Sequence, residues 1–153
     1  MATTHVHEYT MAHAADITFE VGYWCCIGMV GILCTDLLFA RQFKARYFVC
    51  HSMINCIITF LVLPDSYWIL TDPLEALQAK SCSMVPLGLV FAIHFYHMIG
   101  AFVPIKYGGF KLYYVDWLHH ILMVVLGCPA IMFAAMGPSV NLNWLFICGF
   151  PGG

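Results

Sequence analysis

The chain has 153 residues, of which 62% are hydrophobic and only 9% are charged, and its formal net charge is −2. Soluble domains carry about 25% charged residues, so these charges are too few to solvate a water-soluble protein of this size. The composition also excludes intrinsic disorder and a nucleic-acid-binding polyelectrolyte. Together with a mean hydropathy of +0.84, it predicts an integral membrane protein.

Four apolar runs approach the length of about 20 residues that a helix needs to cross a bilayer. They predict an all-α, polytopic transmembrane bundle of at least four spans, at residues 19–40, 47–63, 82–103 and 113–136. We expect the second span to end at Pro64, and Pro129 to bend the fourth. Residues 19–150 then form one transmembrane domain behind a polar tail, residues 1–18, which has no features of a secretory signal.

A further apolar segment, residues 139–150, is too short to cross a bilayer. The sequence stops directly after it, at Pro151-Gly152-Gly153. This abrupt end leads us to expect that the chain belongs to a longer gene product.

The eight cysteines lie inside the apolar runs or near their edges rather than in polar loops. Cysteines in this setting behave as small apolar residues. We therefore predict free thiols in place of a disulfide framework.

The basic residues give an orientation. Five of the six lie in the connections on one side of the predicted spans, namely Arg41, Lys44, Arg46, Lys106 and Lys111, whereas Lys80 lies on the other side. The positive-inside rule makes the side with five bases cytosolic. The amino-terminal tail and the loop at residues 64–81 then face the opposite side.

The loop at residues 64–81 contains the run Asp72-Pro73-Leu74-Glu75. An N-cap aspartate, a proline at the first helical position and an acid at the third are typical of a helix start. We predict a short helix in the membrane interface here.

Ionisable residues inside spans are costly and therefore raise a functional hypothesis. At a rise of 1.5 Å per residue, they lie about 6–14 Å from the basic side of their spans. The polar layer comprises Asp36, His51, Asn55, His94, His97, Asp116, His119 and His120. Its members come from four antiparallel spans, which predicts that they converge at one depth.

Helical spacing relates some of these residues to each other. His94 and His97 are three residues apart, and Asp116 precedes His119 and His120 by three and four. An aspartate that accepts an imidazole N–H leaves the other nitrogen free to take a proton from a substrate. We predict catalytic roles for His119, His120 and Asp116, and substrate binding by a second group, His51, Asn55, His94 and His97.

Structural explanations stay open for part of this layer. Asp36 is expected to pair with Arg41 or Lys44, and Asn55 to make an interhelical hydrogen bond. His51 alone is more typical of a packing residue.

The run Tyr113-Tyr114-Val115-Asp116-Trp117-Leu118-His119-His120-Ile121-Leu122 resembles the central motif of the TLC domain. That family includes ceramide synthases and the translocating-chain-associating membrane protein. The preceding run His94-Phe95-Tyr96-His97, followed by a short basic loop, is also similar to the family's arrangement. The resemblance is concentrated in residues 90–130.

The resemblance implies a protein of the endoplasmic reticulum that acts on membrane lipid. It implies an acyltransferase with acyl-CoA as co-substrate, with His119 and His120 as the active pair and Asp116 as their supporting acid. The chain departs from the synthases after the pair, where a threonine is usual and Ile121-Leu122-Met123-Val124 stands here. It also lacks their arginine before the aspartate. These departures favour a lipid-binding or lipid-sensing member.

Two other classes stay open. A histidine-metal lipid hydroxylase would use the same histidines, with a single metal ion on His94, His97 and either His119 or His120, although no His-x-x-His-His triplet occurs. A structural subunit of a larger membrane assembly, or a homo-oligomer, would need no chemistry from them. We expect no bound metal or cofactor and no nucleic-acid partner.

Overall fold

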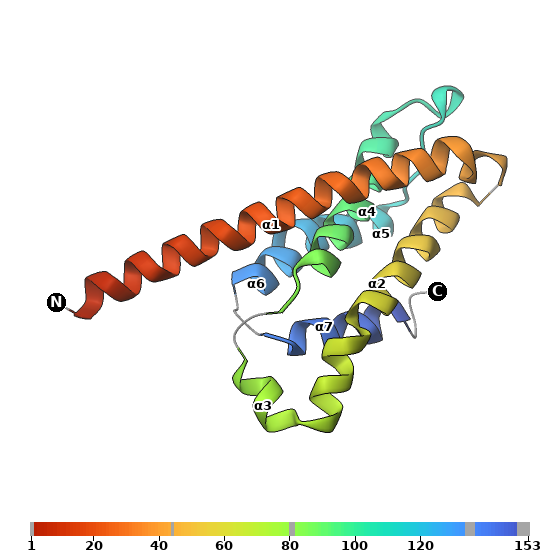
Figure 1. Cartoon of the computed structure of the whole chain (residues 1–153). Helices are drawn as coiled ribbons and strands as arrows, with labels where there is room; N and C mark the ends of the chain where they lie inside the picture. Colours follow the sequence, from red (N-terminus) through yellow and green to blue (C-terminus); the bar gives the residue numbers. More distant parts are fainter. Residues whose placement is uncertain (1, 44, 80–81, 134–136, 150–153) are drawn as a thin grey trace.

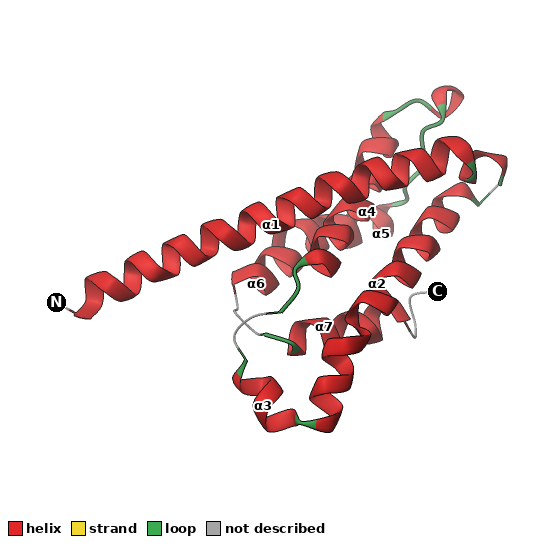
Figure 2. Ribbon diagram, viewed as in Figure 1, coloured by secondary structure: helices red, strands yellow, loops and turns green. Residues whose placement is uncertain are grey.

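The structure, a computed structural model, describes residues 2–43, 45–79, 82–133 and 137–149, and it contains helices and no strand in that part of the chain (Figure 2). The all-α prediction is confirmed. The α-helices are α1 (Ala2–Leu38), α2 (Arg46–Thr71), α3 (Pro73–Gln78), α4 (Val85–Phe102), α5 (Tyr114–Leu122), α6 (Cys128–Phe133) and α7 (Ser139–Trp144). Short 3-10 turns follow α1 and α4, at Ala40–Gln42 and Ile105–Tyr107, and π-helical turns follow α5 and α7, at Met123–Gly127 and Leu145–Gly149.

Four helical segments are long and apolar enough to cross a membrane, as expected of a multi-pass membrane protein. They are Ala14–Leu38, Arg46–Thr71, Val85–Phe102 and Tyr114–Met132. The first belongs to α1, whose helix also includes residues 2–13 of the polar tail.

The second span extends beyond the end expected at Pro64. Helix α2 continues through Pro64 to Thr71, and Pro64 is exposed on its surface. A proline costs the helix one backbone hydrogen bond. In a bilayer, ending the helix would leave several backbone groups without partners, so continuing it is the less costly solution.

The fourth span is irregular directly before Pro129. Helix α5 passes into the π-helical turn Met123–Gly127, and α6 then carries Pro129 in its first turn. Proline cannot donate its share of the backbone ladder, and wider turns are a common local response. Pro86 likewise occupies the first turn of α4 and so stands at the start of the third span.

Helix α4 is the central element of the bundle. The long helix α1 lies along it, and α2 and α7 lie on its other side (Figure 1). Both glycine positions that face this contact are tight. A Cβ atom at Gly28 would lie 2.8 Å from Cβ of Ala92, and one at Gly88 would lie 2.6 Å from Cβ of Trp24. Small residues thus allow α1 and α4 to approach closely, as is usual between helices in membranes.

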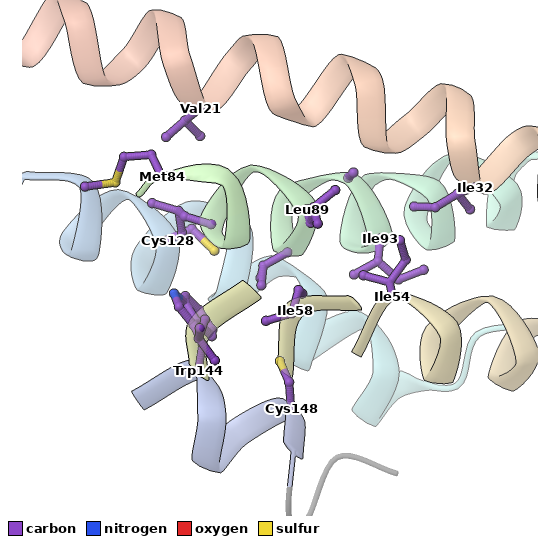
Figure 3. Close-up of a cluster of buried hydrophobic side chains, with 14 of the residues drawn as sticks. Val21, Ile32, Ile54, Ile58, Met84, Leu89, Ile93, Cys128, Trp144 and Cys148 are labelled. Carbon is purple, nitrogen blue, oxygen red and sulfur yellow. The ribbon is translucent and has the colours of Figure 1, made fainter. Parts of the chain in front are cut away.

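The apolar core gathers side chains from most of these helices (Figure 3). Ile32 of α1 and Ile58 of α2 are fully buried, as is Ile93 of α4 to within 2%. Trp144 of α7 is 1% exposed and closes the core on the side away from α1. The short segment at residues 139–149 therefore packs against α2 rather than spanning the bundle.

Polar contacts hold this segment in place. The side-chain amide of Asn141 donates to the carboxylate of Asp65 on α2 and to the backbone carbonyl of Ser83, at 2.5 and 3.2 Å. Asn141 is 1% exposed, so both contacts are shielded from water.

The predicted short helix is confirmed as α3. Asp72 is its N-cap and accepts a hydrogen bond from the backbone N–H of Glu75 at 3.3 Å. Leu74 and Leu77 are both exposed, which suits a helix lying in the membrane interface.

All eight cysteines are free thiols, as predicted. Cys82, which lies between the second and third spans, is partly buried near two acids. Burial, followed by the charges of Asp65 and Glu20, raises the pKa of the Cys82 thiol to about 11. The thiol is therefore protonated and a poor nucleophile at neutral pH.

Candidate functional site

Five histidines from three helices form one group, here called the histidine cluster: His51, His94, His97, His119 and His120. Their ring centroids connect in a chain, with His51 5.6 Å from His97 and His97 5.1 Å from His120. His94 lies 5.1 Å from His120 and 5.2 Å from His119. The convergence predicted for these histidines is confirmed.

Helix α4 holds its two histidines in the interior. His94 is 5% exposed and His97 is fully buried, because both lie on the face of α4 that packs into the bundle. His120 of α5 is 1% exposed, whereas its neighbour His119 lies on an exposed face of the same helix. The cluster therefore reaches the surface of the chain at His119.

Within the histidine cluster, His94 and His119 form a direct hydrogen bond between their imidazole rings. Nδ1 of His94 lies 2.7 Å from the carbonyl oxygen of Val90, so Nδ1 carries a hydrogen and donates it. Nε2 of neutral His94 is then an acceptor, and it lies 3.2 Å from Nε2 of His119. His119 donates across this contact, which leaves its own Nδ1 as the proton-accepting nitrogen.

His97 and His120 have no hydrogen-bond partner for either ring nitrogen among the described residues. A buried polar group without a partner costs about 1–3 kcal/mol. Such groups are rare in native proteins and call for a specific explanation, such as a catalytic role or a bound ion. The most unusual feature of the cluster is therefore that two adjacent imidazoles at its centre are buried without hydrogen-bond partners among the described residues.

His51 is oriented from within its own helix. The side-chain amide of Asn55, one turn further along α2, donates to Nδ1 of His51 at 3.0 Å. This intrahelical bond fixes the tautomer of His51, with the hydrogen on Nε2, and the interhelical bond expected of Asn55 stays a prediction.

Asp116 makes a contact within its own helix, and its predicted role as the acid that supports His119 and His120 stays a prediction. Its Oδ2 atom accepts a hydrogen bond from the backbone N–H of Tyr113 at 2.9 Å, which caps the amino-terminal end of α5. The imidazole of His119 at the surface is in contact with His94.

Asp36 lies outside the cluster and pairs with arginines. It is 3% exposed, with Arg46 2.5 Å away and Arg41 3.7 Å away. The predicted partner Arg41 is confirmed, and the other candidate, Lys44, lies outside the described residues. Arg46 is the stronger partner, and sequence spacing missed it because it belongs to the next helix.

Arg46 also fixes the loop between the third and fourth spans. Its guanidinium donates to the backbone carbonyl of Gly108 at 2.5 Å and lies over the ring of Phe110, 4.7 Å from the centroid. Gly108 has φ of +93°, a conformation that favours glycine. The two loops that carry the basic residues are thereby joined.

A cavity of about 880 Å³ lies between these two loops, and we call it the basic cavity. Its walls include Arg41, Arg46, Tyr47, Lys111, Tyr113 and Asp116. Tyr47 links it to the histidine cluster, because its ring stacks on His97 with centroids 4.0 Å apart. A polar ligand in the cavity would therefore lie one aromatic ring away from the buried imidazoles.

Three members of the cluster also lie close enough together to share a metal ion. One ring nitrogen from each of His94, His119 and His120 lies within 4.8 Å of the other two. The chemistry open to the site is thus proton transfer by neutral imidazoles or coordination of one metal ion.

Comparison of the chain with protein-family models, curated proteins and solved structures finds no match, so the assignment of the site depends on its geometry.

Proposed function

We propose that the chain is a lipid-handling membrane protein, which binds the polar part of a lipid in the basic cavity and acts on it at the histidine cluster. The observation that carries this proposal is the contiguity of five span histidines with a cavity that arginine and lysine side chains line. Ionisable groups at membrane depth are costly and mark functional sites by default. Packing alone gives no reason to gather five of them.

The resemblance to the TLC domain supports a lipid as the ligand. The residues that carry the resemblance, His119 and His120 with His94 and His97, all belong to the cluster. By that resemblance, we propose residence in the endoplasmic reticulum and acyl-CoA as co-substrate. Lys111 and the half-exposed Arg41 of the basic cavity suit a phosphate-bearing ligand.

Acyl transfer at this site would use His119 as general base. The amine or hydroxyl of the acceptor lipid would form a bond to the thioester carbonyl carbon, and its proton would pass to Nδ1 of His119. The carbon–sulfur bond would then break, and the departing thiolate of coenzyme A would recover that proton. His94 would orient His119 through the 3.2 Å contact between their Nε2 atoms.

The test replaces the exposed His119 and the buried His120 together, as H119A/H120A. Whole-cell lipids of this variant are compared with those of wild type at equal expression. We expect a change in at least one lipid class, and no change for the control H13A, which lies before the first span. Unchanged lipids together with unchanged lipid binding by the purified double variant would refute the proposal.

A structural subunit is the second candidate, because large apolar side chains such as Phe19, Phe60 and Phe102 are exposed along three different helices. Membrane lipid or partner helices could cover them equally well. A subunit would co-purify in mild detergent with stoichiometric partners. In that case, the whole-cell lipids would not change in the variant H119A/H120A.

A further inference from the structure

We propose that His94, His119 and His120 hold a single transition-metal ion, with Zn²⁺ as the best fit. The inference concerns the site of the proposed function and rests on that function only for what the ion would do there. The binding of the ion itself follows from the positions of three imidazoles on two helices.

The distance between the first two ligands matches a shared ion. Zinc binds histidine nitrogen at about 2.0–2.1 Å with tetrahedral geometry, which places two ligand nitrogens about 3.3 Å apart. The Nε2 atoms of His94 and His119 lie 3.2 Å apart. The same contact that serves as a hydrogen bond without an ion therefore has the spacing of two ligands with one.

The backbone prepares His94 as a ligand. Histidines that bind metal commonly donate their other ring N–H to a carbonyl or carboxylate, which fixes the tautomer and aims the free nitrogen. Nδ1 of His94 makes this bond to the carbonyl of Val90, at 2.7 Å. Its Nε2 lone pair is thereby directed at His119.

The surroundings of His120 are a second observation that favours a bound ion, independent of the contact between His94 and His119. It is 1% exposed, and neither of its nitrogens has a hydrogen-bond partner among the described residues. A buried imidazole in this state is costly. Coordination to an ion beside His94 and His119 would satisfy it, since a ligand nitrogen of each lies within 4.8 Å of the others.

The three imidazoles limit which metals can bind and leave one coordination position open. Three imidazoles without a thiolate or carboxylate suit zinc, copper, iron or nickel. Three histidines with an open fourth position are the ligand set of a catalytic rather than a structural zinc site. Because His119 is exposed, a water or a lipid oxygen could reach an ion bound there.

A bound ion would change the chemistry of the proposed function. Zinc lowers the pKa of a bound water towards neutrality and polarises carbonyl oxygens. The ion and its water would then take over the proton-accepting role assigned above to His119.

The test measures metal in the full chain, purified in mild detergent with an affinity tag that contains no histidine and after a wash with a weak chelator. Elemental analysis is expected to give about one zinc per chain for wild type. The zinc content of the variant H94Q/H119Q/H120Q is expected to be at least about tenfold lower than that of wild type. H51Q is the matched control, because His51 belongs to the histidine cluster but not to the three proposed ligands, and it is expected to retain the metal.

Cobalt substitution of the wild-type chain keeps the test decisive if the triple variant does not fold. Co²⁺ added to the metal-free chain is expected to give the intense visible absorption of a tetrahedral site, which Zn²⁺ then abolishes. Less than about one-tenth of an equivalent of any transition metal, with no such absorption, would overturn the proposal. Equal metal in wild type and the triple variant, or equal loss in H51Q, would also overturn it.

These outcomes are separate from those of the lipid experiment. One zinc per chain, with unchanged cellular lipids and unchanged lipid binding in H119A/H120A, would support the metal site and refute the lipid function. Altered lipids in that variant, with a metal-free wild-type chain, would do the reverse.

Discussion

At the scale of single residues, the carboxylates in the spans show how a charge at membrane depth is accommodated. Asp36 forms ion pairs with two arginines, and Asp116 accepts a hydrogen bond from the backbone N–H of the N-cap residue of its own helix. Each carboxylate is thereby partnered without using a histidine. The imidazoles are left to interact with one another.

The capping role of Asp116 gives a prediction. Asparagine retains a side-chain oxygen that can cap α5, so D116N should leave the lipid phenotype within about twofold of wild type. D116A removes the acceptor and should destabilise the chain by about 1 kcal/mol. The measurement is the cellular lipid profile at equal expression.

An orienting carboxylate would behave differently, because changing such an aspartate to asparagine lowers turnover by orders of magnitude. A D116N variant as inactive as H119A/H120A would therefore contradict the capping role and restore Asp116 as the partner of the histidine pair.

The ion pair of Asp36 gives a second prediction. D36N leaves Arg46 without its buried partner, and breaking such a pair from one side costs on the order of 3 kcal/mol. R41Q removes the weaker and half-exposed partner, which should cost less than about 1 kcal/mol. Thermal unfolding in mild detergent should therefore show a much larger fall in Tm for D36N. Equal falls for the two variants would contradict the primacy of Arg46.

At the scale of elements, the contact between α1 and α4 depends on particular glycines. Gly28 and Gly31 lie on the same helix, yet only Gly28 faces α4 closely, and a Cβ atom at Gly31 would meet nothing within 4 Å. G28A should therefore destabilise the bundle by about 1–3 kcal/mol through overpacking. G31A is the matched control and should be neutral or slightly stabilising, because alanine favours the helix.

Detergent titration or thermal unfolding of the two variants measures this difference. The close packing of α1 on α4 would be wrong if G31A lost as much stability as G28A.

The elements also show what the sequence could predict. Hydropathy located the four spans, and the rise per residue placed the five histidines at one depth, because both quantities depend only on position along the chain. The contact of Asp116 with Tyr113 depends on α5 beginning at Tyr114, and tyrosine is not among the preferred N-cap residues, so the sequence does not point to it. The continuation of α2 through Pro64 differs from the expected end because a helix that stops inside a bilayer leaves backbone groups unsatisfied, a cost that is absent in water.

At the scale of the whole molecule, Arg41, Arg46 and Lys111 lie beside the histidine cluster at one end of the bundle. Arg46 joins the end of α1, the start of α2 and the loop after α4, and these segments enclose the basic cavity. The outer surfaces of the spans expose large apolar side chains. A ligand with a charged head and an apolar chain would match both parts at once.

Photoaffinity labelling tests this central claim most directly. The purified chain in phosphatidylcholine nanodiscs would be exposed to a fatty acyl-CoA that carries a diazirine near the thioester, and labelled peptides would be mapped by mass spectrometry. The account predicts labels in the cavity walls, residues 45–48 and 108–113, and their loss when unmodified acyl-CoA is in excess. Labels spread along the exposed face of α1 and insensitive to competition would contradict it.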